Sequence, residues 1–444
     1  MSARFLLLVA LLLAILGGCG QGANLPVSAR SAWVKAMGAP DSERPFPSGF
    51  LWGVATSGHQ LEGGDRSSNW AVWEETGHGE TPCGIADDEY DRYEADLDLA
   101  QAMGLKAFRM SLEWSRIEPE RGVFDPSAIA HYHAEIRAIL AHGLVPIVTM
   151  MHFTYPSWLD EPTSQGPGGW ESVSTLMAFD RYAALVAREY APEVRYWITI
   201  NEPNTEALCG YLLGVFPPGK HDPLAYSRVL GHLEQAHRLA YAELHAVRPD
   251  VMVSINPFIF RTREASYATQ AMNPTETAIL DVAYEAHALD YVAFDYYYPI
   301  SPQDWPKLWH AWTWPVYPEG LYASCKELYA RYKLPLLVAE NGMATDGDRP
   351  RSDGWTRSAF LVNHLAQLRR AMAEGVPVMG YMYWSLVDNY EWGSYDPCFG
   401  LFAIDRRDPT LHRIRTRAVD TYTAIAQANG LPFSLLARYL GKKN

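Results

Sequence analysis

Short apolar runs alternate with longer amphipathic stretches along most of the chain. The runs are rich in β-branched and aromatic residues and apolar on both faces, which is typical of parallel strands buried on both sides. The predicted strands cover residues 50–56, 107–113, 145–152, 196–201, 252–256, 291–297, 336–340 and 378–386. The predicted helices that follow them cover residues 89–103, 126–142, 176–190, 224–247, 276–287, 319–332, 355–374 and 415–427.

Eight successive strand–helix units predict the α/β class and a single (β/α)₈ barrel (a TIM barrel) in one domain over residues 44–444. An open doubly wound sheet is the alternative. The glycine-rich nucleotide motif that such a sheet usually carries is absent after the first strand. In a barrel, functional side chains gather just beyond the C-terminal ends of the strands. We therefore expect the chemistry at that end.

The N-terminal residues resemble an export signal. Arg4 precedes an apolar run over residues 5–16 that is too short for a comfortable membrane span. The run leads into Leu-Gly-Gly-Cys, which ends at Cys19 and resembles a bacterial lipobox. We predict a lipoprotein signal peptide over 1–18 and a tether over 19–43. A lipid on Cys19 would then hold the exported protein at a membrane, on the periplasmic or cell-surface side. An ordinary signal peptide with an incidental cysteine is the alternative.

Composition and charge limit the partners. The chain has 444 residues, 48% hydrophobic and 20% charged, which is enough apolar material for a globular core. Its net charge is −14, and no basic run extends beyond Lys442 and Lys443, so nucleic acid and anionic polymers are poor partners. The 15 Trp and 26 Tyr residues suit sugar faces as well as cores.

Two glutamates end predicted strands. Glu202 closes Trp-Ile-Thr-Ile-Asn-Glu, and Glu340 closes Leu-Leu-Val-Ala-Glu. Burying a carboxylate there is costly unless it is paired or functional. One such glutamate could equally be part of a structural ion pair. Two of them, each beside an asparagine at the expected functional end, favour catalysis.

Four motifs resemble glycoside hydrolase family 1, in family order and across nearly the whole domain. Residues 50–63 are similar to its N-terminal signature, and Thr-Ile-Asn-Glu-Pro around Glu202 to its acid/base motif. Ala-Glu-Asn-Gly around Glu340 resembles its nucleophile motif, and residues 383–392 resemble its sugar-binding loop. The four long matches together are specific, whereas Asn-Glu-Pro alone would be weak.

The resemblance implies a retaining β-glycosidase that cleaves the terminal non-reducing sugar by double displacement, without a cofactor or metal. Glu340 would be the nucleophile and Glu202 the acid/base, with their carboxyl groups about 5–5.5 Å apart. Arg109 would lie beside Glu340 and favour its ionised form, and Tyr297 would donate a hydrogen bond to it. Trp314 would be an aglycone platform.

The same resemblance implies the sugar-binding residues. Asn201 would hold the 2-hydroxyl, a contact that strengthens in the transition state. Trp384 would form the floor under the ring, and Trp392 would contact a hydroxyl through its indole N–H. The remaining hydroxyl-binding residues are Gln60, His152 and Glu391.

Some positions bear on specificity. Glu391 next to Trp392 argues against phosphorylated sugars, because a carboxylate would repel a phosphate. Glucose is the expected sugar, with galactose, fucose and mannose left open. Asp295 stands where the family usually has asparagine, so an additional acid would lie near the nucleophile or bind a different aglycone.

Other hypotheses remain. A sugar-binding pseudoenzyme on the same fold is disfavoured because both catalytic glutamates are present. A metal-dependent hydrolase is disfavoured because His131 and His133 do not share a helix face and no His-Glu-x-x-His occurs. The cysteines after position 19 show no Cys-x-x-Cys spacing, which makes a zinc site unlikely on pattern alone and leaves disulfides open.

Overall fold

The computed structural model describes residues 45–79, 81–162, 167–261, 274–299, 310–347 and 349–443. The predicted signal peptide, Cys19 and the tether lie outside these residues. Within them, no helix combines the length and the apolar character needed to span a membrane.

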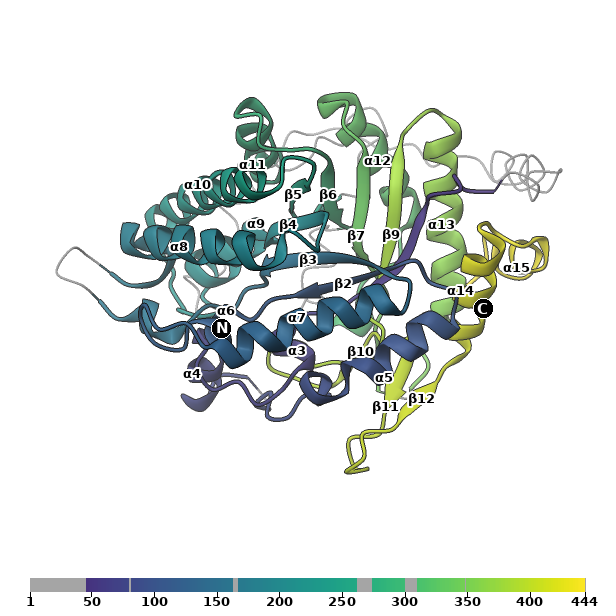
Figure 1. Cartoon of the computed structure of the whole chain (residues 1–444). Coiled ribbons are helices and arrows are strands. Elements are labelled where there is room, and N and C mark those ends of the chain that lie inside the picture. Colours follow the sequence, from purple (N-terminus) through teal and green to yellow (C-terminus); the bar gives the residue numbers. More distant parts are fainter. Residues whose placement is uncertain are drawn as a thin grey trace, which may run out of the picture.

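Eight parallel strands form the centre of the fold (Figure 1). They are β1 Leu51–Ala55, β2 Ala107–Ser111, β3 Val145–Met151, β4 Tyr196–Asn201, β5 Met252–Asn256, β6 Val292–Asp295, β7 Leu336–Asn341 and β9 Val378–Trp384. Their hydrogen-bonded order is β5-β4-β3-β2-β1-β9-β7-β6. A parallel bridge between Phe258 and Asp295 joins the chain after β5 to β6. The ring is thereby nearly closed, which confirms the predicted (β/α)₈ barrel.

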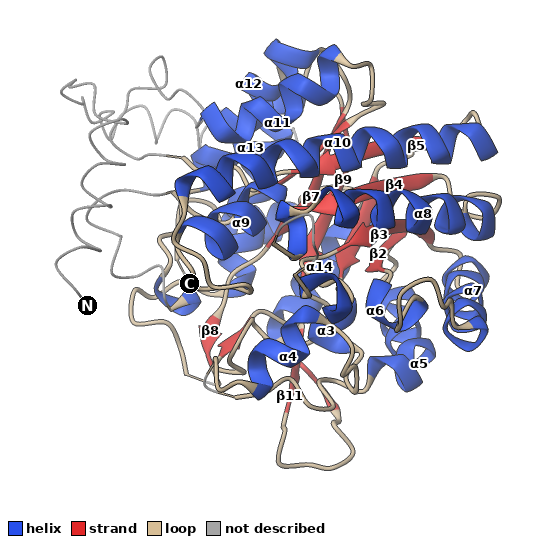
Figure 2. Ribbon diagram, turned by 90° about the vertical axis from the view of Figure 1, so that its left-hand side faces the viewer, coloured by secondary structure: helices blue, strands red, loops and turns tan. Residues whose placement is uncertain are grey.

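Helices surround the strands (Figure 2). The long helices of the outer layer are α5 Glu89–Ala102, α7 Pro126–Ala141, α8 Val173–Tyr190, α10 Pro223–Val247, α11 Pro274–Glu285, α12 Pro318–Tyr332, α13 Arg357–Ala373 and α14 Arg417–Ala428. Each predicted helix corresponds to one of them, with small differences at the ends. A further helix, α15 Phe433–Tyr439, follows α14.

Short elements occupy the loops, and the sequence did not predict them. The helical ones are α3 Gly58–Leu61, α4 Asn69–Glu75, α6 Trp114–Ile117, α9 Pro203–Ala207, the π-helix η4 Leu208–Leu212 and the 3₁₀ turns η2 Ser157–Asp160, η3 Gly169–Glu171 and η6 Ala311–Thr313. Two antiparallel pairs complete the fold: β8 Thr345–Asp346 with β10 Pro397–Cys398, and β11 Phe402–Ile404 with β12 Arg413–Arg415.

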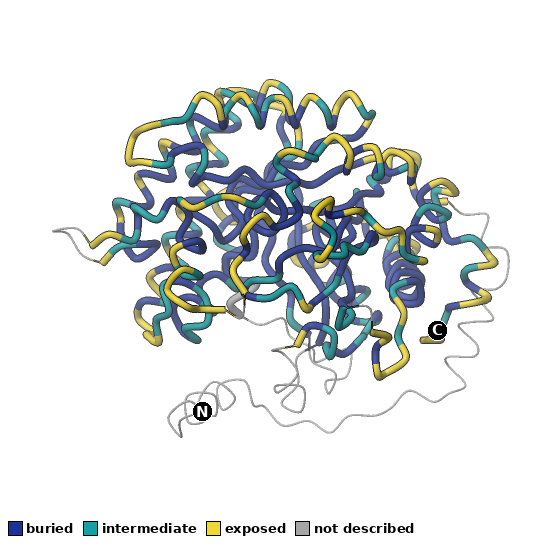
Figure 3. The backbone as a smooth tube through the Cα atoms, turned by 90° about the horizontal axis from the view of Figure 1, so that it is seen from below, coloured by how far each residue is buried: buried dark blue, intermediate teal, exposed yellow. Residues whose placement is uncertain are grey.

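Alternate strand residues serve two apolar layers, as the two-residue period of a strand requires. Ala107, Ile147 and Ile198 belong to a cluster inside the barrel. Their neighbours Phe108 and Val148 belong to the larger cluster between strands and helices. The buried centre is visible as the dark tube in Figure 3. Burial on both faces explains why the strands read as continuous apolar runs.

Side-chain caps fix where several helices begin. Asp125 precedes α7 and accepts a hydrogen bond from the Ser127 N–H at 2.7 Å, with Pro126 in the first helical turn. Asp222 precedes α10 and accepts from the Leu224 N–H at 2.8 Å. Such caps satisfy donors that a helix leaves open, and each stabilises its helix by roughly 1 kcal/mol. Local hydrogen bonds therefore fix the residue at which each of these helices begins.

Five strands end earlier than predicted. The predicted strands 50–56, 107–113, 145–152, 291–297 and 378–386 leave the sheet after Ala55, Ser111, Met151, Asp295 and Trp384. The apolar pattern continues past these points because the loops at the barrel mouth are also buried. The residues beyond each end therefore line the mouth instead of extending the sheet.

All four cysteines of the described residues are unpaired. Cys83 and Cys325 are buried, whereas Cys209 and Cys398 are partly exposed. Burial raises the pKa of the Cys83 thiol well above its usual range, so this side chain stays protonated. The open question of disulfides is therefore resolved in favour of free thiols within these residues.

Candidate active site

The predicted site residues meet at the C-terminal end of the barrel. Arg109 lies within β2, Asn201 ends β4, Glu340 lies within β7, and Trp384 ends β9. The others belong to segments just beyond a strand: Gln60 in α3, His152 after β3, Glu202 after β4, Tyr297 after β6, and Glu391 and Trp392 after β9. Parallel strands bring these ends together, as expected for a barrel of this type.

The strand pairing is irregular where the catalytic side chains leave the sheet. The register of β4 against β5 shifts between Ile198 and Asn201, and that of β6 against β7 shifts between Phe294 and Asp295. A third shift, in β7 against β9, lies between Val338 and Asn341. Such irregularities turn a side chain out of strict alternation and are common next to active sites. They lie at the positions from which the carboxyl groups project.

Glu340 is held by a cation and a hydroxyl. The Arg109 Nη1 atom lies 2.5 Å from Glu340 Oε1, and both side chains are almost fully buried. The Tyr297 hydroxyl donates to Glu340 Oε2 at 2.6 Å. Burial and the charge of Glu340 raise the pKa of Tyr297 well above its usual range, so the phenol keeps its proton. Both contacts stabilise an ionised Glu340.

Glu202 lies where the chain turns from β4 into α9. Its backbone is left-handed, with φ 38° and ψ 56°, a conformation that a non-glycine residue adopts rarely and often at functional sites. The side chain is 6% exposed. Burial and the negative charge of Glu340 raise the pKa of Glu202 well above its usual range. The pair therefore combines a protonated acid with an ionised neighbour, as a glycosidase requires.

Three carboxyl groups converge at this point. One oxygen from each of Glu202, Asp295 and Glu340 lies within 4.8 Å of the other two. All three residues are buried. The two predicted catalytic glutamates therefore approach each other from the ends of β4 and β7. Asp295, which departs from the family pattern, is the third member.

Asn201 is oriented by hydrogen bonds on both of its polar atoms. Its Oδ1 accepts from Arg109 Nη2 at 2.7 Å and from Asn256 Nδ2 at 2.8 Å. Its Nδ2 lies 3.1 Å from His152 Nε2. Burial and the nearby Arg109 charge lower the pKa of His152 well below its usual range, so the neutral ring can accept this hydrogen bond. The amide is thus fixed beside both catalytic glutamates.

A second group forms around Glu391. Glu391 Oε1 accepts from Trp384 Nε1 at 2.9 Å and from Asn389 Nδ2 at 2.8 Å. Burial raises the pKa of Glu391 to about 8. Gln60 is fully buried, accepts from the Ser57 hydroxyl and donates to the Tyr390 carbonyl at 2.8 Å. These contacts orient the predicted hydroxyl-binding groups toward one side of the mouth.

The aromatic residues frame the site. Trp392 stacks with His59 at an angle of 8° and with His152 at 16°. Trp384 also stacks with His152, with ring centroids 5.9 Å apart. Trp314 is only partly buried, and its ring lies 4.2 Å from that of Tyr298. Trp384 and Trp392 are thus linked through His152 to Asn201, whereas Trp314 packs against Tyr297, which donates a hydrogen bond to Glu340.

Some polar residues of the matched segments have roles that only the structure reveals. Glu62, near the end of the matched segment 50–63, forms a buried ion pair with Arg116 at 2.6 Å and accepts from Tyr132. It is therefore structural. Asn256 was missed, although it ends β5 as Asn201 ends β4 and pairs with it in register. Asn389 was within the matched sugar-binding loop, but its role in holding Glu391 is visible only in three dimensions.

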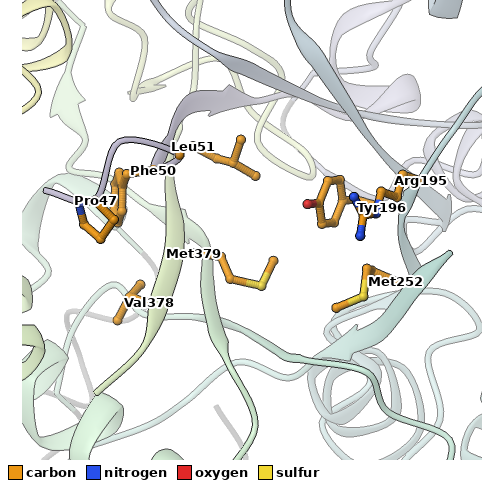
Figure 4. Close-up of a pocket in the computed structure, with 9 residues that line it drawn as sticks. Pro47, Phe50, Leu51, Arg195, Tyr196, Met252, Val378 and Met379 are labelled. Atoms are coloured by element: carbon orange, nitrogen blue, oxygen red, sulfur yellow. The ribbon is translucent and has the colours of Figure 1, made fainter. Parts of the chain in front are cut away.

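A cavity of about 280 Å³ lies at the other end of the barrel (Figure 4). It is lined by the first residues of several strands, among them Leu51 of β1, Tyr196 of β4, Met252 of β5 and Val378 of β9. None of the predicted site residues lines it. Catalysis in such barrels takes place at the opposite end, so the cavity is not the active site.

Comparison with known proteins gives consistent matches. The model described as Glycosyl hydrolase family 1 matches residues 42–270 and 261–431. The chain is 30% identical to β-glucosidase A of Thermotoga maritima, over 87% of this chain and 99% of that protein. It is 27% identical to the aryl-phospho-β-D-glucosidase BglH of Bacillus subtilis, over 88% and 99%.

Solved structures agree with these matches. The family 1 β-glucosidase from Thermotoga maritima in complex with isofagomine lactam has a TM-score of 0.75 and 27% identity, and covers 87% of this chain and 100% of its own. The β-glycosidase from Pyrococcus horikoshii has a TM-score of 0.76 and 30% identity, and covers 89% and 98%. The similarity extends over essentially the whole barrel.

Proposed function

The chain belongs to glycosyl hydrolase family 1, and from this premise we propose that it is a retaining β-glycosidase. The observation that supports this most strongly is the spacing of Glu202 and Glu340, whose nearest carboxylate oxygens lie within 4.8 Å. Retaining glycosidases hold their carboxyl groups about 5–5.5 Å apart, whereas inverting ones leave about 6.5–9.5 Å for a water molecule. A direct attack by one glutamate fits the shorter distance.

The first half-reaction uses both glutamates. Glu340, held by Arg109 and Tyr297, attacks the anomeric carbon and forms a glycosyl ester. Glu202 donates its proton to the leaving oxygen. Once Glu340 is esterified its negative charge is gone, and one cause of the raised pKa of Glu202 disappears with it. Glu202 can then accept a proton from the water that cleaves the ester.

The substrate we propose is an unphosphorylated β-glycoside with glucose as its terminal non-reducing sugar. Asn201 would bind the 2-hydroxyl, and Gln60, His152 and Glu391 the other hydroxyls. Glu391 accepts hydrogen bonds from the neutral side chains of Trp384 and Asn389, and neither carries the positive charge that a phosphate needs. Relatives named β-glucosidase support glucose, and this position argues against a 6-phosphosugar.

Two matched variants test the catalytic assignment. Glu340→Gly should lose turnover, and azide should rescue it by attacking from the side that the nucleophile vacated, giving an α-glycosyl azide from an activated β-glycoside. Glu202→Ala should still form the ester with activated substrates, and azide should then give the β-glycosyl azide. Products with the opposite configurations would exchange the two roles and contradict the proposal.

A substrate panel tests the sugar. We expect the highest kcat/KM for the p-nitrophenyl β-glucoside among the glucoside, galactoside, fucoside and mannoside. The 6-phosphoglucoside should be hydrolysed at background rates. A preferred galactoside would leave the mechanism intact but refute glucose, and efficient hydrolysis of the phosphosugar would refute the role given to Glu391.

We further propose that the protein is an exported lipoprotein anchored through Cys19. The support is the sequence alone: an apolar run over residues 5–16 and small residues before the cysteine. The full-length protein, expressed in a bacterium fed an alkyne-tagged fatty acid, should carry the tag and remain in salt-washed membranes. Cys19→Ala should abolish the tag and release the protein. An untagged wild type, or a tagged variant, would contradict the anchor.

A further inference from the structure

Asp295 lies inside the catalytic centre although the mechanism above does not use it. It ends β6 and pairs in register with Glu340 of β7. Its exposed fraction is 0%, and one of its carboxyl oxygens lies within 4.8 Å of oxygens of both Glu202 and Glu340. A carboxyl group in this place faces both catalytic residues without contact with bulk solvent.

The two oxygens of Asp295 have different surroundings. Oδ2 accepts from Asn256 Nδ2 at 2.5 Å. Oδ1 is buried, and no N–H or O–H donor of the described residues reaches it. Glu202 is close enough for a hydrogen bond between the two carboxyl groups. Two ionised carboxylates cannot make that bond because both only accept, whereas a single proton between them satisfies the orphaned atom.

The charges around Asp295 also favour a proton between Asp295 and Glu202. The titratable and charged groups that face it are Glu202 after β4, Glu340 of β7, Arg109 of β2 and Tyr297 after β6. The one cation in this set is bound to Glu340. Burial and the charge of Glu340 raise the pKa of both Asp295 and Glu202 well above the usual range. Three buried carboxylates beside one guanidinium would leave two charges uncompensated, so protonation is favoured.

We propose that Asp295 and Glu202 hold one proton between them, and that Asp295 is a positioning residue that keeps the acid protonated at alkaline pH. This inference rests on the proposed glycosidase function. Asp295 raises the pH at which the acid loses its proton, because removing the shared proton would place two negative charges side by side in a buried site.

The proton count balances through the reaction. Before reaction, Glu340 carries one negative charge, and the pair formed by Asp295 and Glu202 carries one. When Glu340 becomes an ester, its charge is lost, and the proton of the pair passes to the leaving oxygen, so the pair then carries two. Water returns a proton to the pair when it cleaves the ester, and Glu340 regains its charge. The total on the three carboxyl groups is the same at each stage, so Arg109 faces a constant charge.

Asp295→Asn tests the proposal through the pH dependence of kcat/KM on an aryl β-glucoside. The repulsion between two charges 4.8 Å apart at an effective dielectric constant of about 20 moves a pKa by roughly 2.5. The alkaline limb, which reports loss of the acid's proton, should therefore move to lower pH by up to roughly 2.5. An unmoved limb, or one at higher pH, would overturn the proposal.

The matched control is Asp96→Asn, which makes the same exchange at another buried aspartate. Asp96 lies on α5, accepts from Arg413 Nε at 2.8 Å and is not one of the three converging carboxyl groups. The alkaline limb of the pH profile of this control variant should lie at the same pH as that of the wild type. An equal shift in this control would assign the effect to a general loss of buried charge and overturn the specific pairing.

A second measurement does not depend on turnover. In protein labelled with ¹³C at the glutamate side-chain carboxyl, the Glu202 signal is identified by its absence in Glu202→Gln. Glu340 remains beside Glu202 in both proteins, so the Glu202 signal should show one more titration step in the wild type than in Asp295→Asn. A single step in the wild type would overturn the proposal even if Asp295→Asn failed to fold. A two-step titration in a protein that cleaves no β-glycoside would instead refute the proposed function.

Discussion

Replacing Arg109 is the sharpest test of how the nucleophile is prepared. Its guanidinium contacts Glu340 Oε1 at 2.5 Å, Asn201 Oδ1 at 2.7 Å and Thr149 Oγ1 at 3.1 Å, and the side chain is fully buried. Arg109→Met keeps most of the volume but removes the charge and all these donors. Glu340 then keeps only the Tyr297 hydroxyl as a donor among the contacts described above.

The magnitude follows from the burial. Removing one partner of a buried ion pair costs about 3–5 kcal/mol, because the other charge is left uncompensated. Since about 1.36 kcal/mol corresponds to a factor of ten in rate, kcat/KM should fall by roughly 150- to 5,000-fold. Arg109→Lys keeps a charge near Glu340 but loses the planar fork that also reaches Asn201 and Thr149. The lysine variant should lose only about 1.5–3 kcal/mol of transition-state stabilisation, so kcat/KM should fall by roughly 10- to 150-fold.

The assay is kcat/KM for p-nitrophenyl β-glucoside at a pH on the plateau of the wild-type profile. Circular dichroism and thermal unfolding of both variants would show that the barrel remains folded at the assay temperature. A methionine variant within tenfold of the wild type, or one more active than the lysine variant, would refute the electrostatic role of Arg109.

Three further outcomes follow from the site. Glu391→Gln should cost about 1.5–3 kcal/mol in kcat/KM, because the variant loses charge-assisted hydrogen bonds. The loss should be larger at pH 9 than at pH 6, because wild-type Glu391 has a pKa of about 8 and is mostly protonated at pH 6. A loss that does not depend on pH would contradict this role. Trp314→Ala should raise KM for aryl and disaccharide substrates, because the role proposed for this partly exposed ring is to support the aglycone. Azide reactions of a preformed glycosyl ester should be unchanged, and a matched loss in both steps would place the ring under the sugar. Incubation with a chelator should leave kcat/KM unaltered, because Arg109 already supplies the positive charge beside Glu340; activity lost to the chelator and restored by a divalent ion would contradict the mechanism.

The barrel could be predicted because its strands are buried on both faces. The run that became β9 has no polar side chain that could make it resemble a loop, and several helices begin at Asp–Pro or serine caps. The short elements could not be predicted, since helices of one turn show no period. The pairing of β8 with β10 joins segments that lie far apart in sequence, which a local pattern cannot reveal.

The site was predictable where motifs were long and failed where contacts are purely spatial. Glu202 and Glu340 were identified by their place at strand ends and by the matching segments around them. Asn256 carried no motif, and its link to Asn201 and Asp295 depends on the register of β5. Asp295 was noticed as a departure from the family, but its closeness to Glu202 depends on the shifted pairing at the end of β6.

The stereochemistry of the first-formed sugar tests the central claim most directly. Hydrolysis of an aryl β-glucoside by a high concentration of the wild-type enzyme can be followed by ¹H NMR of the anomeric proton, before mutarotation mixes the anomers. Because Glu202 and Glu340 are too close together to leave room for a water molecule between Glu340 and the anomeric carbon, we expect the β anomer to appear first. Initial release of the α anomer would show a single displacement by water and contradict the double-displacement mechanism.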